Sequence, residues 1–131
     1  AKEAISILTE DVQIPVSMHA CGNLNQVFKE LTKFPVDILD FEFAGNSDNI
    51  HLLEKNKNLL KGKKLGFGCL DSASKKMDDE EKTRNLIKKA IELIGEENLL
   101  LDPDCGLKKV PIDMATKKLK LMIKLNKELS K

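Results

Sequence analysis

Hydrophobic and polar positions along this chain follow two different periods, which alternate from the N-terminus to the C-terminus. Between residues 36 and 44 apolar residues occupy every second position, so that Phe41 lies on one face of a strand and Glu42 on the other. Between residues 79 and 94 the apolar residues recur at three- and four-residue spacing, which predicts an amphipathic helix that stops at Gly95.

The same two patterns predict a regular series of elements over the whole chain. In order, they are a helix at 1–10, a strand at 14–18, a helix at 24–34, a strand at 36–44, a helix through residues 50–60, a strand at 64–71, a helix at 79–94, a strand at 98–102 and a last helix that begins near Pro111. Four consecutive strand-helix units with short loops are typical of an α/β fold with parallel strands.

Composition and charge narrow the class of protein. The 131 residues, 41% of them hydrophobic, suit one packed domain covering 1–131. The formal net charge of +1 gives no electrostatic basis for a nucleic-acid partner. No apolar run approaches the ~18 residues of a membrane span, and no signal segment opens the chain. We therefore expect no membrane partner and a cytoplasmic location; since residue 1 is Ala1, we also expect a piece of a longer chain.

Candidate chemistry gathers where the predicted strands end. His19 and Cys21 lie two residues apart and therefore project from the same face at the end of the first strand. Glu42 lies near the end of the second strand, Asp71 at the end of the third and Cys105 just after the fourth. Because parallel strands bring these ends together, one imidazole, two thiols and a carboxylate would meet there, and such a set suits tetrahedral zinc.

Four segments carry a resemblance to a known family. They are residues 18–23 (MHACGN), 40–42 (DFE), 68–71 (GCLD) and 102–108 (DPDCGLK). In this order and at these spacings, the chain resembles the C-terminal catalytic part of cobalamin-independent methionine synthase, and within that family the short archaeal core form. The resemblance covers essentially the whole chain.

The resemblance implies a fold and an activity. The fold would be the C-terminal half of a (β/α)8 TIM barrel, made of four parallel strand-helix units. The activity would be zinc-dependent methyl transfer to the thiol of homocysteine, which forms methionine. The family's zinc ligands fall on His19, Cys21, Glu42 and Cys105, and Asp71 takes the position of a catalytic carboxylate.

Two departures from the family pattern bear on substrate and assembly. In the long folate-dependent enzymes a histidine stands two positions after the aspartate that matches Asp71, whereas this chain has Ala73. We therefore expect a methylcobalamin or corrinoid protein as methyl donor rather than methyl-folate. The upstream elements that help to hold homocysteine are also absent from these 131 residues. An open half-barrel with free strand edges and an apolar interior would favour self-association.

Two alternative functions remain open at this point. One is a zinc methyltransferase of the uroporphyrinogen decarboxylase-like group, which would act on coenzyme M. Glu42 and the stretch 102–106 resemble the methionine synthases more closely. The other alternative is a zinc-binding fragment without catalytic activity, because half a barrel holds an incomplete substrate pocket.

Other polar residues have simpler interpretations. Cys69 is expected to be a buried, inert thiol, and His51 a surface residue. Asp71 could equally be a cap on the polar loop that follows it. Asp102 and Asp104 are candidates to orient the ligands through hydrogen bonds. In the last helix, apolar residues such as Met122 are expected in the core, and the lysines at 117, 118 and 124 on the solvated face.

Overall fold

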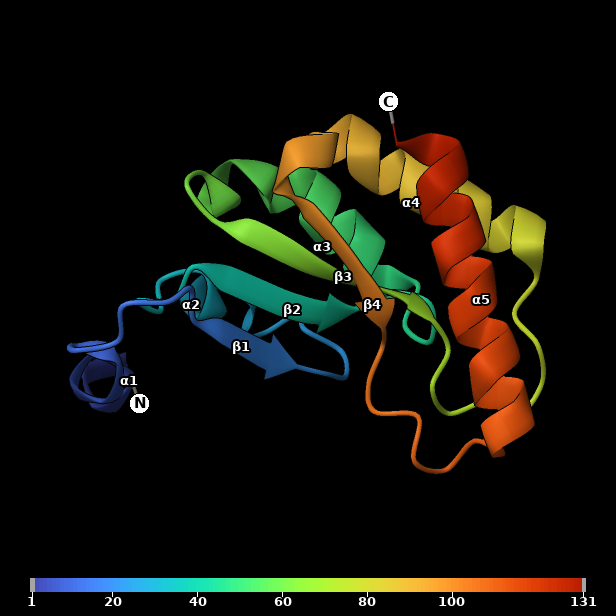
Figure 1. Ribbon diagram of the computed structural model, residues 1–131. Coiled ribbons are helices and arrows are strands. Elements are labelled where there is room, and N and C mark those ends of the chain that lie inside the picture. The colour runs from blue at the N-terminus through green and yellow to red at the C-terminus, as the bar shows by residue number, and fades with distance from the viewer. Residues whose placement is uncertain (1, 131) are drawn as a thin grey trace.

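The computed structural model describes residues 2–130 and contains one parallel sheet, in which the strands lie side by side in the order of the sequence, β1-β2-β3-β4 (Figure 1). The strands are β1 (Ser17–Ala20), β2 (Ile38–Glu42), β3 (Lys64–Leu70) and β4 (Leu99–Pro103). The helices are α1 (Lys2–Thr9), α2 (Phe28–Leu31), α3 (Asp48–Asn56), α4 (Glu80–Ile94) and α5 (Ile112–Leu129), with short 3₁₀ turns at Lys57–Leu60 and Glu96–Asn98.

The helices α3, α4 and α5 lie together over one face of the sheet, and the opposite face is open (Figure 1). Large apolar side chains of the central strands point to the covered face, and Leu39, Phe41 and Phe67 are fully buried there. The rings of Phe43 and Phe67 stack with their centroids 4.2 Å apart, which joins the end of β2 to the middle of β3. The two-residue alternation predicted for the second strand is thereby confirmed.

The open face of the sheet is polar rather than apolar at its centre, so the expectation of an apolar interior is wrong. Asp40 and Glu42 of β2 point to this face, together with Asp102 of β4. Between them β3 carries Gly66 and Gly68. A β-carbon on Gly66 would lie 2.7 Å from the β-carbon of Asp40 and 2.9 Å from Oδ2 of Asp102. The glycines therefore leave the room that the carboxylates on both sides occupy.

Two elements near the N-terminus differ from the prediction. The first strand covers Ser17–Ala20 instead of 14–18, so His19 lies inside the strand and Cys21 directly after it. The helix expected at 24–34 is reduced to Phe28–Leu31. Its beginning is lost because the side chain of Asn23 accepts a hydrogen bond from the amide of Asn25, which forms a local turn.

The limits of α4 follow the sequence closely. Asp79 precedes the helix with extended backbone, and its side chain accepts a hydrogen bond from the amide of Lys82 at 2.9 Å. Gly95 ends the helix with φ of 84°, a conformation that glycine adopts without strain. The predicted helix at 79–94 and its stop are confirmed.

One lysine of α5 contradicts the expected solvated face. The side chain of Lys118 is fully buried, and its ammonium group lies 2.7 Å from Oδ2 of Asp78. Lys117 and Lys124 are exposed, as expected. Helical spacing could not identify Lys118, because the acidic partner belongs to a distant loop. Within residues 2–130, no helix has the length and apolar character that crossing a membrane requires.

Candidate metal centre

Three of the expected ligands lie together at the carboxyl ends of the outer strands. A ring nitrogen of His19 and the Sγ atoms of Cys21 and Cys105 all lie within 4.8 Å of one another, and they form the group of potential metal ligands among the described residues. Bond lengths of about 2.3 Å for Zn–S and 2.0 Å for Zn–N place tetrahedral ligands roughly 3.3–3.8 Å apart. Small side-chain rotations would suffice for these residues, so the donor set fits zinc.

The imidazole of His19 is oriented by a carboxylate on the neighbouring strand. Nδ1 of His19 lies 2.9 Å from Oδ2 of Asp40, and the two residues are partners in the register of β1 and β2. Because a carboxylate only accepts hydrogen bonds, Nδ1 carries the ring proton and donates a hydrogen bond to Asp40. The lone pair of Nε2 is then free to bind a metal, which is the usual arrangement around metal-bound histidine.

The thiol of Cys21 lies close to other acidic groups. Desolvation raises the pKa of Cys21, and the neighbouring Cys105 and Glu42 raise it further through charge and, for Cys105, a hydrogen bond. Three groups that become anionic therefore share one small region. A cation placed among them would relieve this repulsion, because a metal-bound thiol is deprotonated.

Glu42 lies near this group but outside it. It is the last residue of β2 and half-buried, and its carboxylate is not among the ligand atoms that lie within 4.8 Å of one another. Its backbone carbonyl accepts a hydrogen bond from Nδ2 of Asn49 at 2.8 Å, and the same amide group donates to the carbonyl of Gly22 at 2.9 Å. Asn49 is fully buried and also accepts from the amide of Leu24.

Asn49 therefore holds the loop after β1 beside the end of β2, and sequence reasoning did not find it. It lies on α3 among polar residues, and the only available signal was an amide side chain in the first turn of a helix that follows a strand end. A buried side chain that makes three hydrogen bonds to the backbone fixes the separation of the segments it joins.

Asp104 joins the ends of three strands. Its carboxylate accepts hydrogen bonds from the backbone amides of Phe43, Ala44 and Gly45 at 2.9, 3.0 and 2.6 Å. Its own amide donates to the carbonyl of Leu70 at 2.9 Å. Burial raises the pKa of Asp104 to about 6, although the three amide donors oppose this shift. The predicted hydrogen bonding of Asp104 is thus directed to the backbone of the β2–α3 loop.

This contact sets the positions of two expected ligands, because Cys105 follows Asp104 and Glu42 precedes the loop that it binds. The close approach depends on Gly68, where a β-carbon would lie 2.6 Å from Oδ1 of Asp104. A small open cleft of about 430 Å³ adjoins the cluster and is lined by His19, Asp40, Pro103, Cys105, Gly106 and Leu107.

Asp40 and Asp102 form a second pair of carboxylates on the open face. They approach each other across Gly66, and the Oδ1 atom of each is buried without a hydrogen-bond partner within residues 2–130. Burial, together with the negative charges of Asp40 and Asp104, raises the pKa of Asp102 to about 7. At neutral pH this carboxyl group is therefore partly protonated, which reduces the repulsion between the two side chains.

Asp71 is held by its own loop. Oδ1 of Asp71 accepts hydrogen bonds from the amides of Ala73 and Ser74 at 2.8 and 3.1 Å. The alternative of a cap on the polar loop is thereby confirmed, and the catalytic role stays a prediction. Asp71 borders Gly45, where a β-carbon would lie 3.6 Å from its Oδ1, so it lies at the same end of the sheet as Asp104.

The two remaining candidates stand apart from the cluster. Cys69 is fully buried on β3, and burial raises its pKa to about 12, so the expected burial is confirmed and the inertness of the thiol stays a prediction. His51 is exposed on α3, as expected, and lies 3.9 Å from Glu54.

The fold and the cluster together define a parallel (β/α) unit with imidazole and thiol groups at the carboxyl ends of its strands. The family described as the catalytic domain of the cobalamin-independent synthase matches residues 1–128. The chain therefore belongs to this family, and the resemblance found in the sequence is confirmed.

Archaeal relatives support the same assignment. The chain is 42% identical over 123 residues to a methionine synthase of Methanothermobacter thermautotrophicus, and 40% identical over 136 residues to a methionine synthase of Methanocaldococcus jannaschii. These alignments cover 94% and 97% of this chain but 39% and 42% of the relatives. The chain thus spans about two fifths of the length of these curated relatives.

Solved structures confirm the fold. A B12-independent methionine synthase from Shewanella sp. W3-18-1, in complex with selenomethionine, matches 95% of this chain with a TM-score of 0.78 and 22% identity. A putative vitamin-B12 independent methionine synthase from Listeria monocytogenes matches 99% with a TM-score of 0.70 and 17% identity. The chain covers 42% and 40% of these structures, in agreement with four strand-helix units of a larger barrel.

Proposed function

We propose that this chain provides the zinc site of a methyltransferase that transfers a methyl group to the sulfur of homocysteine and forms methionine. The observation that carries this proposal is the proximity of His19, Cys21 and Cys105, whose ligand atoms lie within 4.8 Å of one another. These residues belong to the two opposite edges of the sheet, and structural zinc fingers draw their ligands from short sequence spacings instead. Ligands that converge from separate strands are typical of a catalytic site.

The reaction requires a nucleophilic sulfur. A free thiol with pKa ~8.5 is mostly protonated at neutral pH, whereas only the thiolate attacks a methyl carbon effectively. A zinc ion bound here would supply the deprotonation of the homocysteine thiol and keep its sulfur at the site. The sulfur then forms a bond to the methyl carbon while the bond from that carbon to the donor breaks, and the electron pair of the broken bond stays with the donor. The thiol proton passes to solvent.

The residues of this chain have separate tasks in this proposal. The imidazole of His19, oriented by Asp40, and the thiolates of Cys21 and Cys105 bind the metal. Glu42 would complete the set as the hardest ligand, and it is the ligand that a substrate sulfur would replace most readily. Its place just outside the cluster supports this exchangeable role. Two thiolates and one carboxylate would bring three negative charges to a metal ion with two positive charges. This excess of negative charge would keep a bound sulfur electron-rich.

Asp71 is assigned to the ammonium group of homocysteine. One of its carboxylate oxygens accepts from the amides of Ala73 and Ser74, which orients the side chain at the end of β3. The methyl donor in this proposal is methylcobalamin or a corrinoid protein. The support for this donor is Ala73, which cannot protonate a folate leaving group, because its side chain has no ionisable group.

The test is a methyl-transfer assay on this chain and on a Cys105→Ser variant, after zinc loading. Methylcobalamin and methyl-folate serve as donors, and homocysteine and coenzyme M as acceptors. We expect methionine from methylcobalamin and homocysteine, and loss of at least ~10-fold of this activity in the variant. If the chain binds zinc but transfers no methyl group, it is a zinc-binding fragment without catalytic activity. Methylation of coenzyme M, which the family assignment does not favour, would replace homocysteine as the acceptor.

A further inference from the structure

A buried lysine outside the candidate metal centre contacts the backbone of Asp71. The side chain of Lys118 on α5 has no exposed surface, and its Nζ donates to Oδ2 of Asp78 at 2.7 Å and to the carbonyl of Asp71 at 2.9 Å. Burying an ammonium group is unfavourable unless it is paired and hydrogen-bonded, and these two contacts meet that need. The zinc chemistry proposed above does not use this lysine.

Asp71 is bound on both sides of its own backbone by this ion pair. Oδ1 of Asp78 accepts a hydrogen bond from the amide of Asp71 at 2.8 Å, while Lys118 binds the carbonyl of the same residue. The end of β3, the loop that follows it and α5 are thus joined by one closed set of hydrogen bonds. Since a side chain leaves from its own backbone, fixing both peptide groups of Asp71 also fixes the direction of its carboxylate.

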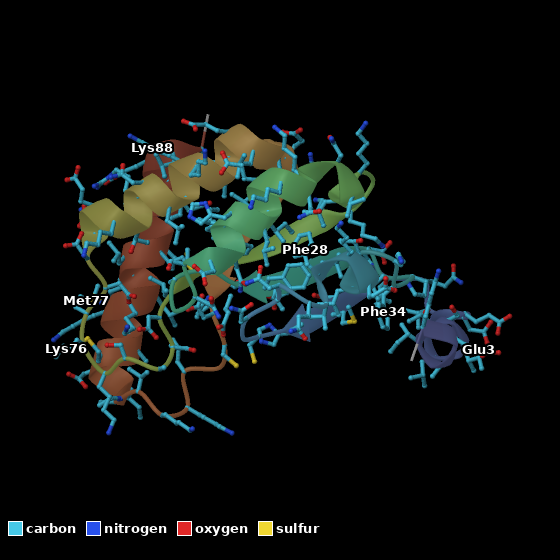
Figure 2. All side chains as sticks on the ribbon, turned by 180° about the vertical axis from the view of Figure 1, so that it is seen from behind. Glu3, Phe28, Phe34, Lys76, Met77 and Lys88 are labelled. Carbon is cyan, nitrogen blue, oxygen red and sulfur yellow. The ribbon has the colours of Figure 1, made fainter. Side chains whose placement is uncertain are left out.

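The loop that carries these contacts extends to the outer edge of the molecule. Figure 2 shows Lys76 and Met77 of this loop at the opposite end of the molecule from Glu3. The loop and the start of α4 also line a cleft of about 390 Å³ that includes Asp71, Asp78 and Ser74. None of residues 72–79 is buried, so this loop would be mobile without an anchor.

Other ion pairs of α5 have a different character. Lys124 lies 2.7 Å from Glu80 of α4, with 52% of its side chain exposed, and its recorded partners within residues 2–130 are side chains. Exposed pairs of this kind contribute little to stability. A buried ion pair can often be replaced by apolar side chains without loss of stability, so stability alone does not explain Lys118.

We propose that Lys118 is a positioning residue, which acts through Asp78 and the backbone of Asp71 to direct the Asp71 carboxylate toward the ammonium group of the substrate. This inference rests on the proposed function for the identity of the substrate. The link also places Asp71 under the control of α5, the helix that follows the loop of Cys105. The positions of the metal ligands and of the Asp71 carboxylate are therefore set by neighbouring parts of one chain.

Three variants of the full chain test the proposal: Lys118→Met, the double variant Lys118→Met with Asp78→Leu, and Lys124→Met as the matched control. The double variant replaces the ion pair by apolar side chains and leaves no unpaired buried charge. If the single variant does not fold, the double variant is used for the test. Amide hydrogen exchange is measured by NMR at Ala73 and Ser74, which donate to the Asp71 side chain. Phe67 provides a core amide for reference.

We expect exchange at Ala73 and Ser74 to become at least ~10-fold faster in both Lys118 variants, with Phe67 unchanged in the double variant. The Lys124→Met variant should match the parent protein. Exchange at the parent rate in the loop of the double variant would overturn the proposal, and so would an equal acceleration at Phe67.

A binding measurement separates positioning from stability. After zinc loading, Lys118→Met or the double variant should bind homocysteine roughly 10-fold more weakly than the parent, because the loss of one charged hydrogen bond has about this effect. Binding of 4-mercaptobutanoate, which lacks the ammonium group, should be unchanged. Equal weakening of both thiols would overturn the proposal. If the parent protein binds no zinc, the proposed function fails, while the amide exchange still tests the positioning of Asp71.

Discussion

Nδ1 of His19 and Oδ2 of Asp40 lie 2.9 Å apart, and the two residues are direct partners across β1 and β2. The parallel register of the sheet thus provides the hydrogen bond that orients a potential metal ligand. The same strand, β2, ends at Glu42, so one five-residue segment carries both an orienting carboxylate and a candidate ligand carboxylate. Asp40, which orients His19, and Glu42, the candidate ligand, are two residues apart on β2 and so lie on the same face.

Removing the Asp40 carboxylate should weaken zinc binding. In an Asp40→Ala variant we expect a ~10- to 100-fold lower zinc affinity, because His19 loses the partner that fixes its tautomer and orientation. Asp40→Asn should have a smaller effect, since its amide oxygen can still accept the proton of Nδ1. Competition with a chromophoric chelator measures both affinities. Asp113→Asn, at an exposed position of α5, is the control. Unchanged affinity in Asp40→Ala would show that His19 does not depend on this contact.

A methyl group at residue 68 should destabilise the chain. In Gly68→Ala the new β-carbon would lie 2.6 Å from Oδ1 and 2.7 Å from the α-carbon of Asp104, so backbone must shift. We expect a decrease of about 1–3 kcal/mol in the free energy of unfolding. Gly106→Ala is the matched control, because a β-carbon there meets no atom within 4 Å. Urea unfolding compares the two, and equal stability would contradict the close packing of Asp104 on β3.

Cys69 should be far less reactive than Cys21 and Cys105. Burial raises the pKa of Cys69 to about 12, so at pH 8 only about 1 thiol in 10⁴ is ionised, and the residue is also inaccessible. Cys21 and Cys105 are exposed. In the zinc-free native chain we expect iodoacetamide to modify these two and spare Cys69, with peptide mass spectrometry as the readout. Zinc should protect Cys21 and Cys105. Modification of Cys69 at a similar rate would mean that the sheet opens readily.

Asp102 should give the zinc-free chain a distinct dependence of stability on pH. Burial raises its pKa from 3.8 to about 7, so between these values the folded chain holds a proton that the unfolded chain releases. Raising the pH over this interval therefore favours unfolding. Its stabilising contribution is complete below about pH 4 and is lost as the pH passes 7.

An Asp102→Asn variant isolates this effect, because its amide does not titrate. The stability of the variant relative to the parent should increase as the pH rises from 4.5 to 8, as measured by urea unfolding at both values. Asp113→Asn, which changes an exposed carboxylate, should show no comparable trend. A constant difference between Asp102→Asn and the parent would mean that Asp102 titrates normally.

Most of the fold followed from local pattern. The alternation through Phe41 and Phe43 identified a strand with one covered face, and Asp79 and Gly95 marked both ends of α4. These signals are local because they depend on backbone period and on capping within a few residues. The resemblance of the segments around Cys21 and Cys105 then gave the family, which the match over residues 1–128 confirms.

The features that the sequence did not reveal depend on contacts between distant segments. Lys118 is buried because Asp78, 40 residues earlier, lies beside it, and no helical period reports such a partner. Asn49 joins two loops through its buried amide in the same way. The helix expected at 24–34 was shortened by a side-chain turn at Asn23. The polar centre of the open face became visible only when the register brought Asp40 and Asp102 to both sides of Gly66.

Zinc K-edge X-ray absorption on the zinc-loaded chain, recorded without and with homocysteine, tests the central claim most directly. We expect two sulfur ligands and two nitrogen or oxygen ligands at rest, from Cys21, Cys105, His19 and Glu42. With homocysteine we expect three sulfur ligands and one fewer oxygen, because the substrate sulfur replaces Glu42. An unchanged sulfur count would contradict the exchange at Glu42. A chain that holds no zinc would contradict the proposed metal site and the methyl transfer that depends on it.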